Sequence, residues 1–328
     1  MKLNPLFCDG AVMQCEKPVR VFGTGKGTVS VSFMNESKTV ESFEENWCVE
    51  LGSHPASGPY TMEIDLNGSK TTLHDIMIGE VILCSGQSNI ELKISEAKDD
   101  FVYESNPLLR LFTVRRPEEG EYFTDEWVFC EKSKVQHWSA IAYHVGRMIR
   151  KEKNCAVGVI ACYQGASVIQ SWTDENLLYA SEYNLPAEVK HQDHRIYPWN
   201  GDGFLFRTMF QTLVPYSLRC VIWYQGESNT SVAEASIYNR LLSLMVSVWR
   251  EQLKDKCLPF VIVQIHTFDL GAPGWKELQN AQIRATKDIP VTIPVISIDL
   301  GEHEKIHPVF KMPVSERIFQ AVSSLIRE

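Results

Sequence analysis

The segment Val81-Ile82-Leu83-Cys84-Ser85-Gly86-Gln87-Ser88-Asn89 joins a short apolar run to a small polar turn. The run has the length and composition of a buried strand, and the turn that follows it displays a serine. A second segment, Val221-Ile222-Trp223-Tyr224-Gln225-Gly226-Glu227-Ser228-Asn229, has the same order of apolar run and glycine-containing polar turn. In open α/β sheets, ligands bind at the carboxyl ends of the strands. We therefore expect the two turns to face one shared cleft.

The pattern of apolar residues changes near residue 75. Residues 1–75 contain short alternating segments, such as Thr28-Val29-Ser30-Val31-Ser32-Phe33, separated by turns of Gly, Asn, Ser and Pro. This pattern favours a small antiparallel β sandwich. After residue 75, strand candidates alternate with helical patterns, which predicts a parallel sheet covered on both faces. We thus predict an α/β protein with an N-terminal β domain, 1–75, and an α/β domain, 76–328. The strand candidates of the second domain are 80–85, 156–162, 219–224, 259–265 and 293–299.

Three segments carry apolar residues at helical spacing, 140–150, 237–246 and 314–326. Residues 95–128 and 180–203 are weakly periodic and rich in polar and aromatic residues, which is typical of surface loops. We expect these two loops to wall the cleft.

The composition excludes several classes of protein. Hydrophobic residues make up 44% and charged residues 22%, which is ordinary globular usage. The net charge of −9 and the lack of a Lys/Arg cluster argue against a nucleic-acid partner. No apolar run approaches the length of a membrane-spanning helix, and the N-terminus lacks the apolar centre of a secretory signal. We expect no membrane partner and a cytoplasmic location, or secretion if a leader has been removed.

The sequence predicts no metal site. Its nine cysteines are scattered without CxxC spacing, which favours buried, reduced thiols over disulfides or zinc ligands. The segment His191-Gln192-Asp193-His194 resembles a cluster of metal ligands, but no Cys or carboxylate partner recurs at a suitable spacing. We interpret it as a solvated loop.

Ser88 is a candidate nucleophile, because a serine that follows a strand presents its hydroxyl at the edge of the sheet. Acyl transfer through a serine also needs a base, an acid that orients the base, and donors for the oxyanion. Of the nine histidines, His307 has the best setting, since the segment Asp299 to Pro308 follows the last apolar strand and reaches the same edge. Glu304 lies three residues before His307, so its carboxylate is within one turn of the imidazole.

Each of these residues also has a purely structural interpretation. Ser88 is equally suited to cap a helix over 89–97, and His307 to be a loop histidine. Glu304 lies in a run of charged residues that water can solvate. Glu227 follows a buried strand, so it is either a hydrogen-bonded scaffold residue or a residue of the site.

Four segments occur in an order that resembles the sialate O-acetylesterase-like members of the SGNH hydrolases. They are Gly79 to Asn89, Gly165 to Trp172, Val221 to Asn229, and Asp299 to Pro308. Near the start of the chain, Asn4 to Gln14 and Gly58-Pro59-Tyr60 resemble the N-terminal β domain of that family. The resemblance runs nearly end to end. It implies a flavodoxin-like, three-layer α/β/α SGNH hydrolase domain with a parallel sheet, preceded by a small β-sandwich-like domain.

The resemblance also implies roles for individual residues. Ser88 would be the nucleophile of an acyl-enzyme mechanism that uses no metal or other cofactor. The oxyanion would be met by the backbone amides of Ser88 and Gly165 and by a polar side chain from the 225–229 turn. Gln225 and Asn229 are the candidates for that side chain, and Gln87 is a further candidate for oxyanion or substrate binding.

The residue that orients His307 is less closely defined. The family commonly has an acid directly before the Ile-His-Pro step, and here that residue is Lys305. Glu304 or Glu302 is then left to orient the imidazole. Glu227, from a neighbouring strand end, is the alternative.

The function implied is a serine carbohydrate O-acetylesterase, with O-acetylated sialic acid as the first choice of substrate. Acetylated xylan or another plant polysaccharide is an alternative substrate. A non-catalytic carbohydrate-binding protein on a hydrolase scaffold is the alternative of a different class, because Ala166 and Lys305 differ from the family pattern. The sequence leaves open which hydroxyl of which sugar is acetylated, the role of the β domain, and the oligomeric state.

Overall fold

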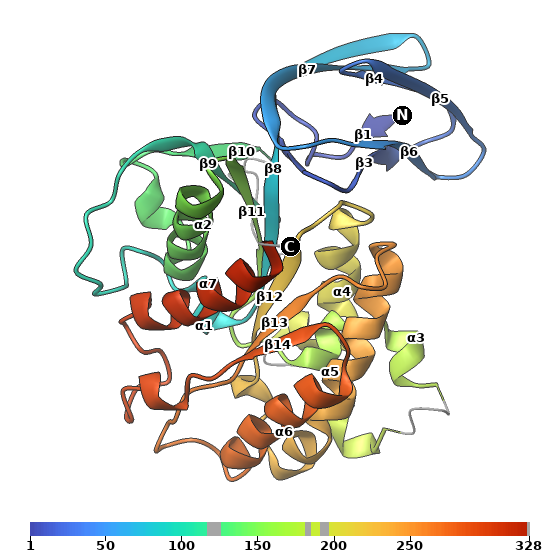
Figure 1. The fold of residues 1–328 in the computed structure, drawn as a ribbon. Helices are drawn as coiled ribbons and strands as arrows, with labels where there is room; N and C mark the ends of the chain where they lie inside the picture. The colour runs from blue at the N-terminus through green and yellow to red at the C-terminus, as the bar shows by residue number, and fades with distance from the viewer. Residues whose placement is uncertain (117–125, 181–184, 191–196, 327–328) are drawn as a thin grey trace.

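The computed structural model describes residues 1–116, 126–180, 185–190 and 197–326, and Figure 1 shows their arrangement. The described strands form a three-stranded antiparallel sheet, β1-β3-β6, and an eleven-stranded mixed sheet. The strands are β1 Lys2–Leu3, β2 Val12–Gln14, β3 Pro18–Thr24, β4 Gly27–Phe33, β5 Glu36–Ser42, β6 Asn46–Ser53, β7 Ser57–Leu66, β8 Ser69–Gly86, β9 Asn106–Thr113, β10 Trp127–Cys130, β11 Ala156–Tyr163, β12 Cys220–Tyr224, β13 Phe260–Val263 and β14 Thr292–Val295.

The centre of the large sheet is parallel. Its strands run in the order β9-β11-β8-β12-β13-β14, and each neighbouring pair is parallel. Every residue of β11 and β12 is buried, as expected for apolar strands covered on both faces. The chain order reverses on either side of β8, so the carboxyl ends of β8, β11 and β12 meet at a topological switch point, where ligands of such folds bind.

Strand β8 connects the two kinds of pairing in the sheet. It is 18 residues long; residues 69–78 pair antiparallel with β7, and residues 79–86 pair parallel with β11. At about 3.3 Å per residue the strand is roughly 60 Å long. In Figure 1 it runs from the N-terminal strands at the top of the view down to α1 (Ser88–Glu91). The N-terminal strands therefore lie at the opposite end of β8 from the candidate nucleophile.

The longer helices cover the sheet. α2 packs against α7, β9 and β11, while α6 packs against α5, β13 and β14. Figure 1 shows α2 and α7 on one side of the central strands and α5 on the other. The helices after α1 are α2 Ala140–Lys153, α3 Glu175–Leu178, α4 Phe204–Thr208, α5 Val232–Gln252, α6 Trp275–Asp288 and α7 Met312–Ile326. No helix of the described ranges is long and apolar enough to cross a membrane.

Aromatic packing fixes the position of β12. The Trp223 ring on β12 makes edge contacts with Trp172 and with Trp249 of α5, at centroid distances of 6.0 and 5.6 Å. All three indoles are fully buried, so they are core residues. Each buries a large apolar area, and such edge-to-face pairs add about 0.5–1.5 kcal/mol beyond burial.

Most predicted elements are present, with two corrections. The five strand candidates overlap β8, β11, β12, β13 and β14, although the last candidate, 293–299, runs past the end of β14 at Val295 into η7 (Ile298–Leu300). The three helical patterns lie within α2, α5 and α7. The predicted parallel sheet is confirmed for the six central strands, but the whole sheet is mixed, because β8 extends into antiparallel pairing with β7 and β10 pairs antiparallel with β9. Residues 95–128 were predicted as loop but include β9 and β10. The three-layer arrangement and the division at residues 75/76 stay predictions.

Candidate active site

Ser88 begins α1 directly after the end of β8. Gly86 allows this abrupt turn, because its φ is +134° and a Cβ at this position would lie 2.1 Å from the carbonyl oxygen of Tyr224. The amide of Gln87 then donates to the same carbonyl at 3.0 Å, which fastens the turn to the end of β12. Ser88 is half-buried, so its hydroxyl is held by rigid elements and still reaches solvent.

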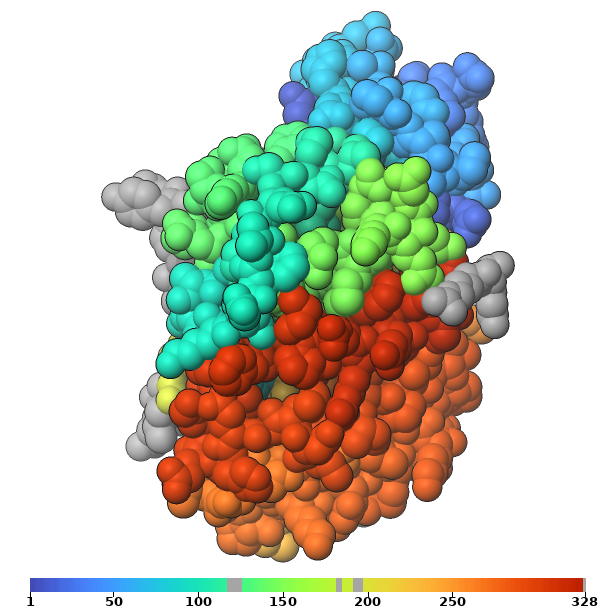
Figure 2. Space-filling view, turned by 60° about the vertical axis from the view of Figure 1, so that its left-hand side comes forward, coloured from blue at the N-terminus to red at the C-terminus, as the bar shows by residue number. Residues whose placement is uncertain are grey.

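His307 contacts Ser88, as predicted from the sequence. Its Nε2 lies 2.7 Å from Ser88 Oγ, within hydrogen-bonding distance, although 219 residues separate the two in the chain. The His307 loop follows η7 (Ile298–Leu300), beyond β14, and is held in place by neighbours: the Lys98 amide donates to Val309 O at 2.9 Å. Figure 2 shows the C-terminal residues, in red, beside the segment near residue 100, in teal.

The environment of His307 favours its neutral form. Partial burial of the ring, followed by the positive charge of Lys311, lowers the pKa of His307 below its ordinary value of 6.5. The carboxylates of Glu96 and Glu91 act weakly in the opposite direction. A neutral imidazole at Nε2 can accept the proton of the Ser88 hydroxyl, which is the first requirement of a general base.

Glu304 and Glu302, the two nearby acids considered for orienting His307, make no hydrogen bond to its ring. Glu304 is exposed at the tip of a turn that the bridge between Glu302 and Lys305 closes. The Glu302 carboxylate instead accepts from the amide of Val309 and from Lys305 Nζ, each at 2.5 Å. Within the described ranges, no carboxylate is bonded to the His307 ring.

Glu227 contacts Asn89, the residue after the serine, rather than the histidine. It is 6% exposed, and its Oε1 accepts from Asn89 Nδ2 at 2.5 Å. Its Oε2 is buried and has no hydrogen-bond partner in the described part of the chain. Burial raises the pKa of Glu227, and the bond from Asn89 and the charge of Lys311 counter that rise. Of the two interpretations of Glu227, the scaffold role fits these contacts.

Two backbone amides near the Ser88 hydroxyl, those of Ser88 and Gly165, are candidates for an oxyanion site. Gly165 lies beside the serine, since a Cβ on Gly165 would be 3.9 Å from Ser88 Cβ. The amide of Gln164 donates to Gly86 O at 3.1 Å, which ties this loop to the end of β8. Among the residues that the structure describes, no protein acceptor takes the N–H of Ser88 or of Gly165. Both groups are therefore free to donate to a developing oxyanion.

The predicted side-chain donors of the 225–229 turn are occupied elsewhere. Gln225 Nε2 donates to Ser167 O and to Asn229 Oδ1, at 2.9 and 2.8 Å. Asn229 Nδ2 donates to Gln170 Oε1 and to Glu234 Oε1, at 2.8 and 3.0 Å. Both side chains are fully buried. These bonds use both N–H groups of each amide, which argues against an oxyanion role for either residue and makes them braces of the turn.

Gln87 is a third brace. It is 2% exposed, and its Oε1 accepts from the amides of Gly226 and Ser228 at 3.2 and 3.3 Å. Its Nε2 reaches Ser228 Oγ at 3.3 Å. Gln87 therefore ties the nucleophile turn to the 225–229 turn, and its burial leaves little of it for contact with substrate.

Two residues that the sequence analysis missed lie directly behind Ser88 and His307. Asn89 is fully buried, and its Nδ2 donates to the carbonyl of Ile306 at 3.0 Å. Lys311 is 1% exposed, and its Nζ donates to Asn89 Oδ1 at 2.7 Å. Asn89 belongs to the quoted serine turn, so its position was a usable signal. The burial of a lysine four residues after a histidine has no signal in the sequence.

No group of three or more His, Cys, Asp or Glu side chains in the described ranges is arranged to hold a metal ion. The segment His191-Gln192-Asp193-His194 lies outside these ranges, as do parts of the two predicted loops, 117–125 and 181–184.

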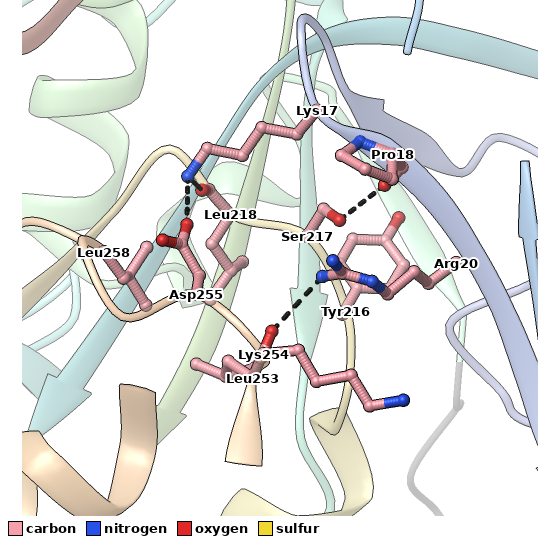
Figure 3. Close-up of a pocket in the computed structure, with 10 residues that line it drawn as sticks. All are labelled: Lys17, Pro18, Arg20, Tyr216, Ser217, Leu218, Leu253, Lys254, Asp255 and Leu258. Atoms are coloured by element: carbon pink, nitrogen blue, oxygen red, sulfur yellow. Dashed lines mark hydrogen bonds and ion pairs between the residues drawn. The ribbon is translucent and has the colours of Figure 1, made fainter. Parts of the chain in front are cut away.

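A cavity of about 230 Å³ lies at the other end of the sheet, near the amino ends of β12 and β13. In Figure 3, Lys17 Nζ reaches Leu218 O and the Asp255 carboxylate, each at 2.6 Å. None of the predicted site residues lines it. The lining residues are Lys17, Pro18, Arg20, Tyr216, Ser217, Leu218, Leu253, Lys254, Asp255 and Leu258.

Known proteins similar to this chain are sialate O-acetylesterases and a carbohydrate acetylesterase. The chain is 24% identical to human sialate O-acetylesterase over 349 residues, which cover 93% of this chain and 66% of the human protein. It is 24% identical to the rat sialate O-acetylesterase over 370 residues, covering 90% of this chain and 68% of the rat protein. The chain thus spans about two thirds of the length of these relatives. The crystal structure of a carbohydrate acetylesterase from Xanthomonas citri has a TM-score of 0.85 and 28% identity, covering 99% of this chain and 75% of that chain.

The match to a protein family spans most of the chain and all four sequence segments. Residues 79–313 match the family described as carbohydrate esterase, sialic acid-specific acetylesterase. This range includes Ser88, Gly165, the 225–229 turn and His307. The chain therefore belongs to the sialic acid-specific acetylesterase family of carbohydrate esterases.

Proposed function

We propose that the chain is a serine carbohydrate O-acetylesterase in which Ser88 is the nucleophile and His307 the general base. The observation that carries the proposal is the 2.7 Å contact between His307 Nε2 and Ser88 Oγ at the carboxyl end of the central strand. A nucleophile within hydrogen-bonding reach of a base is the signature of an activated hydroxyl. Family membership and the partly exposed position of Ser88 support the same assignment.

The proposed mechanism has two halves. His307 Nε2 takes the proton of Ser88 as Oγ attacks the acetyl carbonyl, and the amides of Ser88 and Gly165 donate to the oxyanion. The tetrahedral intermediate collapses, the bond to the sugar oxygen breaks, and His307 returns the proton to that oxygen. Water then attacks the acetyl-enzyme with His307 again as base, which releases acetate and restores Ser88.

The proposed substrate is an O-acetylated sialic acid. Support comes from the family description and from the mammalian relatives, which are sialate O-acetylesterases. We extend the proposal to the architecture, in which residues 76–328 form a flavodoxin-like three-layer hydrolase domain preceded by a β domain of residues 1–75.

The test of the proposal is acetate release from p-nitrophenyl acetate by the wild type and by Ser88→Ala, with folding checked by circular dichroism. We expect turnover to fall by about 10⁴-fold or more in the variant, the scale seen when a serine nucleophile is removed. Ser95→Ala is the matched control, because Ser95 is an exposed serine just after the same helix. Equal rates in the wild type and Ser88→Ala would refute the nucleophile, and absence of activity in both would favour a binding protein.

A broader carbohydrate esterase is the second candidate. The Xanthomonas citri structure, which covers 99% of this chain, is described as a carbohydrate acetylesterase without reference to sialic acid. Acetate release from O-acetylated sialic acid and from acetylated xylan, compared as kcat/KM, separates the two. A preference for xylan would replace the proposed substrate and keep the mechanism.

A further inference from the structure

The carboxamide of Asn89 connects the two sides of the candidate site. Asn89 directly follows Ser88, and its Nδ2 donates at 3.0 Å to the carbonyl of Ile306, the residue before His307. The Asn89 side chain is fully buried, whereas Ile306 is 37% exposed, so the donor end of this bond is shielded from water. The bond therefore fixes the position of the backbone just before His307 relative to α1, the helix that carries Ser88.

Two opposite charges hold the Asn89 carboxamide from either side. Lys311 Nζ donates to its Oδ1 at 2.7 Å, and its Nδ2 donates to Glu227 Oε1 at 2.5 Å. A carboxamide has a donor end and an acceptor end, so a cation at the oxygen and an anion at the nitrogen fix its orientation. With these charges in place, the Nδ2 group has to face Ile306.

Lys311 is itself locked in position. Its backbone amide and that of Met312 donate to Asp99 Oδ1 at 2.9 and 2.8 Å, at the start of α7. The other oxygen of Asp99 lies 3.3 Å from Nε2 of the buried His144. The ammonium makes one hydrogen bond in the described ranges, to Asn89. A buried cation whose hydrogen bond goes to a carboxamide rather than to a carboxylate is costly, and such a cost is expected where the group has a function.

We propose that Lys311, Asn89 and Glu227 form a buried positioning relay that holds the His307 imidazole against Ser88 in place of a carboxylate bonded to the ring. The proposal rests on the catalytic roles given above to Ser88 and His307. Lys311 is a positioning residue, because it touches neither the substrate nor the reacting atoms and acts through Asn89 and Ile306. Glu227 contributes to His307 by this route and not by contact with the imidazole.

The effect of the relay can be measured through the pKa of His307, because charged groups around the ring influence it. Lys311 lowers the pKa of His307, while Glu96 and Glu91 raise it, and the buried His266 is kept neutral because burial lowers its pKa to about 4. Lys311 itself faces Glu227, Asp99 and Glu302, and burial lowers its pKa to about 8. Arg116 pairs with Glu91 and Lys305 with Glu302, at 2.6 and 2.5 Å, whereas Lys311 is the cation that acts on His307. Loss of the Lys311 charge therefore removes that influence on the imidazole.

The experiment compares Lys311→Met with the wild type and with Lys98→Met. Lys98 is an exposed lysine beside the same loop, so its substitution is the matched control. Because Lys311→Met leaves Glu227 without a counter-charge, the double variant Glu227→Gln/Lys311→Met is made as well. In that variant the glutamine oxygen still accepts from Asn89, and the buried site is neutral, which preserves folding.

The decisive measurement is the NMR titration of the His307 imidazole, assigned with His307→Gln, since it needs no turnover. We expect the pKa of His307 to rise in the double variant and to stay at the wild-type position in Lys98→Met. A double variant that folds and titrates His307 as the wild type does would overturn the relay.

Kinetics provide the second measurement. With p-nitrophenyl acetate, we expect kcat to fall by about 10²-fold in the double variant while KM stays within about twofold, as a misplaced base would cause. A larger KM with unchanged kcat would contradict a positioning role. A wild type without esterase activity would refute the proposed function. The titration of His307 would then remain as the test of whether Lys311, Asn89 and Glu227 act on the imidazole.

Discussion

Ser88 and His307 are the proposed reactive pair of the site, and the surroundings of His307 determine the pH range in which its imidazole can accept a proton. The imidazole has to be neutral to accept the serine proton. Partial burial and then the Lys311 charge lower its pKa, so the neutral form persists to a lower pH than in an ordinary histidine. This is the direction that a general base operating at neutral pH requires.

The pH dependence of kcat/KM follows from that shift. Activity should be full above the His307 pKa and fall tenfold per pH unit below it, because each proton bound inactivates one base. Since the pKa is lowered, the midpoint should lie below 6.5. Rates with p-nitrophenyl acetate from pH 4.5 to 8, on enzyme shown to stay folded, provide the measurement. A midpoint above 6.5, or no decline at all, would contradict the role of His307.

Gly86 is the residue on which the serine turn depends. We expect Gly86→Ala to destabilise the protein by about 3 kcal/mol or more, because the added Cβ would meet Tyr224 O at 2.1 Å in a backbone that L residues avoid. Gly68→Ala is the control, since φ is +87° there but no atom lies within 4 Å, and only about 1–2 kcal/mol of backbone strain remains. Urea unfolding compares them. Equal losses would show that the close contact to β12 is relieved at little cost.

Among the elements, α5 supports the 225–229 turn from its N-terminal end. It begins at Val232, two residues after Thr230, the C-cap of η6 (Glu227–Asn229). Its N-cap, Ser231, accepts from the amide of Glu234 at 3.2 Å and donates to the Glu234 carboxylate at 2.7 Å. Glu234 Oε1 in turn accepts from Asn229 Nδ2. The first turn of the helix thus joins a capping motif to the brace of the site.

Ser231→Ala should lower the free energy of unfolding by about 1 kcal/mol, the usual cost of a lost N-cap. The matched control is Ser236→Ala on the exposed side of the same helix, expected to change stability by less than about 0.5 kcal/mol. Chemical denaturation followed by tryptophan fluorescence reports both. Equal stability of the two variants would show that water replaces the hydrogen bonds of the cap without loss of free energy of unfolding.

Across the whole molecule, charged contacts join the N-terminal strands to the parallel sheet. Arg219 donates twice to the Glu80 carboxylate on β8, at 2.7 and 3.1 Å, and also reaches Glu16 at 3.0 Å. Glu80 is 3% exposed. The Lys17–Asp255 pair, at the cavity of Figure 3, is more open, with side chains 24% and 26% exposed. Both ion pairs connect the N-terminal strands to the parallel sheet, but the Arg219–Glu80 pair is more buried than the Lys17–Asp255 pair.

This difference predicts unequal costs of removal. Arg219→Met should destabilise the protein by about 3–5 kcal/mol, because it leaves the Glu80 carboxylate buried without its partner. Lys17→Met should cost about 1 kcal/mol or less, since water can solvate Asp255. Urea unfolding curves of both variants test the ranking, and a Lys17 variant that is as unstable as the Arg219 variant would reverse it.

Much of the architecture followed from local patterns. The apolar runs of β11 and β12 are uninterrupted because both faces are covered, so they were recognised as buried strands. β9 was missed because its apolar residues are mixed with Asn106, Pro107 and Arg110, and the buried Arg110 depends on bonds to distant carbonyls and to the Asp75 carboxylate. β10 has only four residues, too few to show a periodic pattern. The pairing of Ser88 with His307 could be predicted because consecutive parallel strands deliver their carboxyl ends to one edge.

The sequence could not specify which hydrogen-bond partner each polar side chain takes once the turns come together. Gln225, Asn229 and Glu227 follow a strand end exactly as site residues do, yet their hydrogen bonds are directed into the scaffold. A polar side chain forms its hydrogen bonds with the partners that lie within about 3 Å. Which groups lie that close depends on segments that are remote in the chain. The burial of Lys311 behind Asn89 exists only after α7 has docked. Residue types therefore specified the strands and the reactive pair, whereas packing assigned the supporting roles.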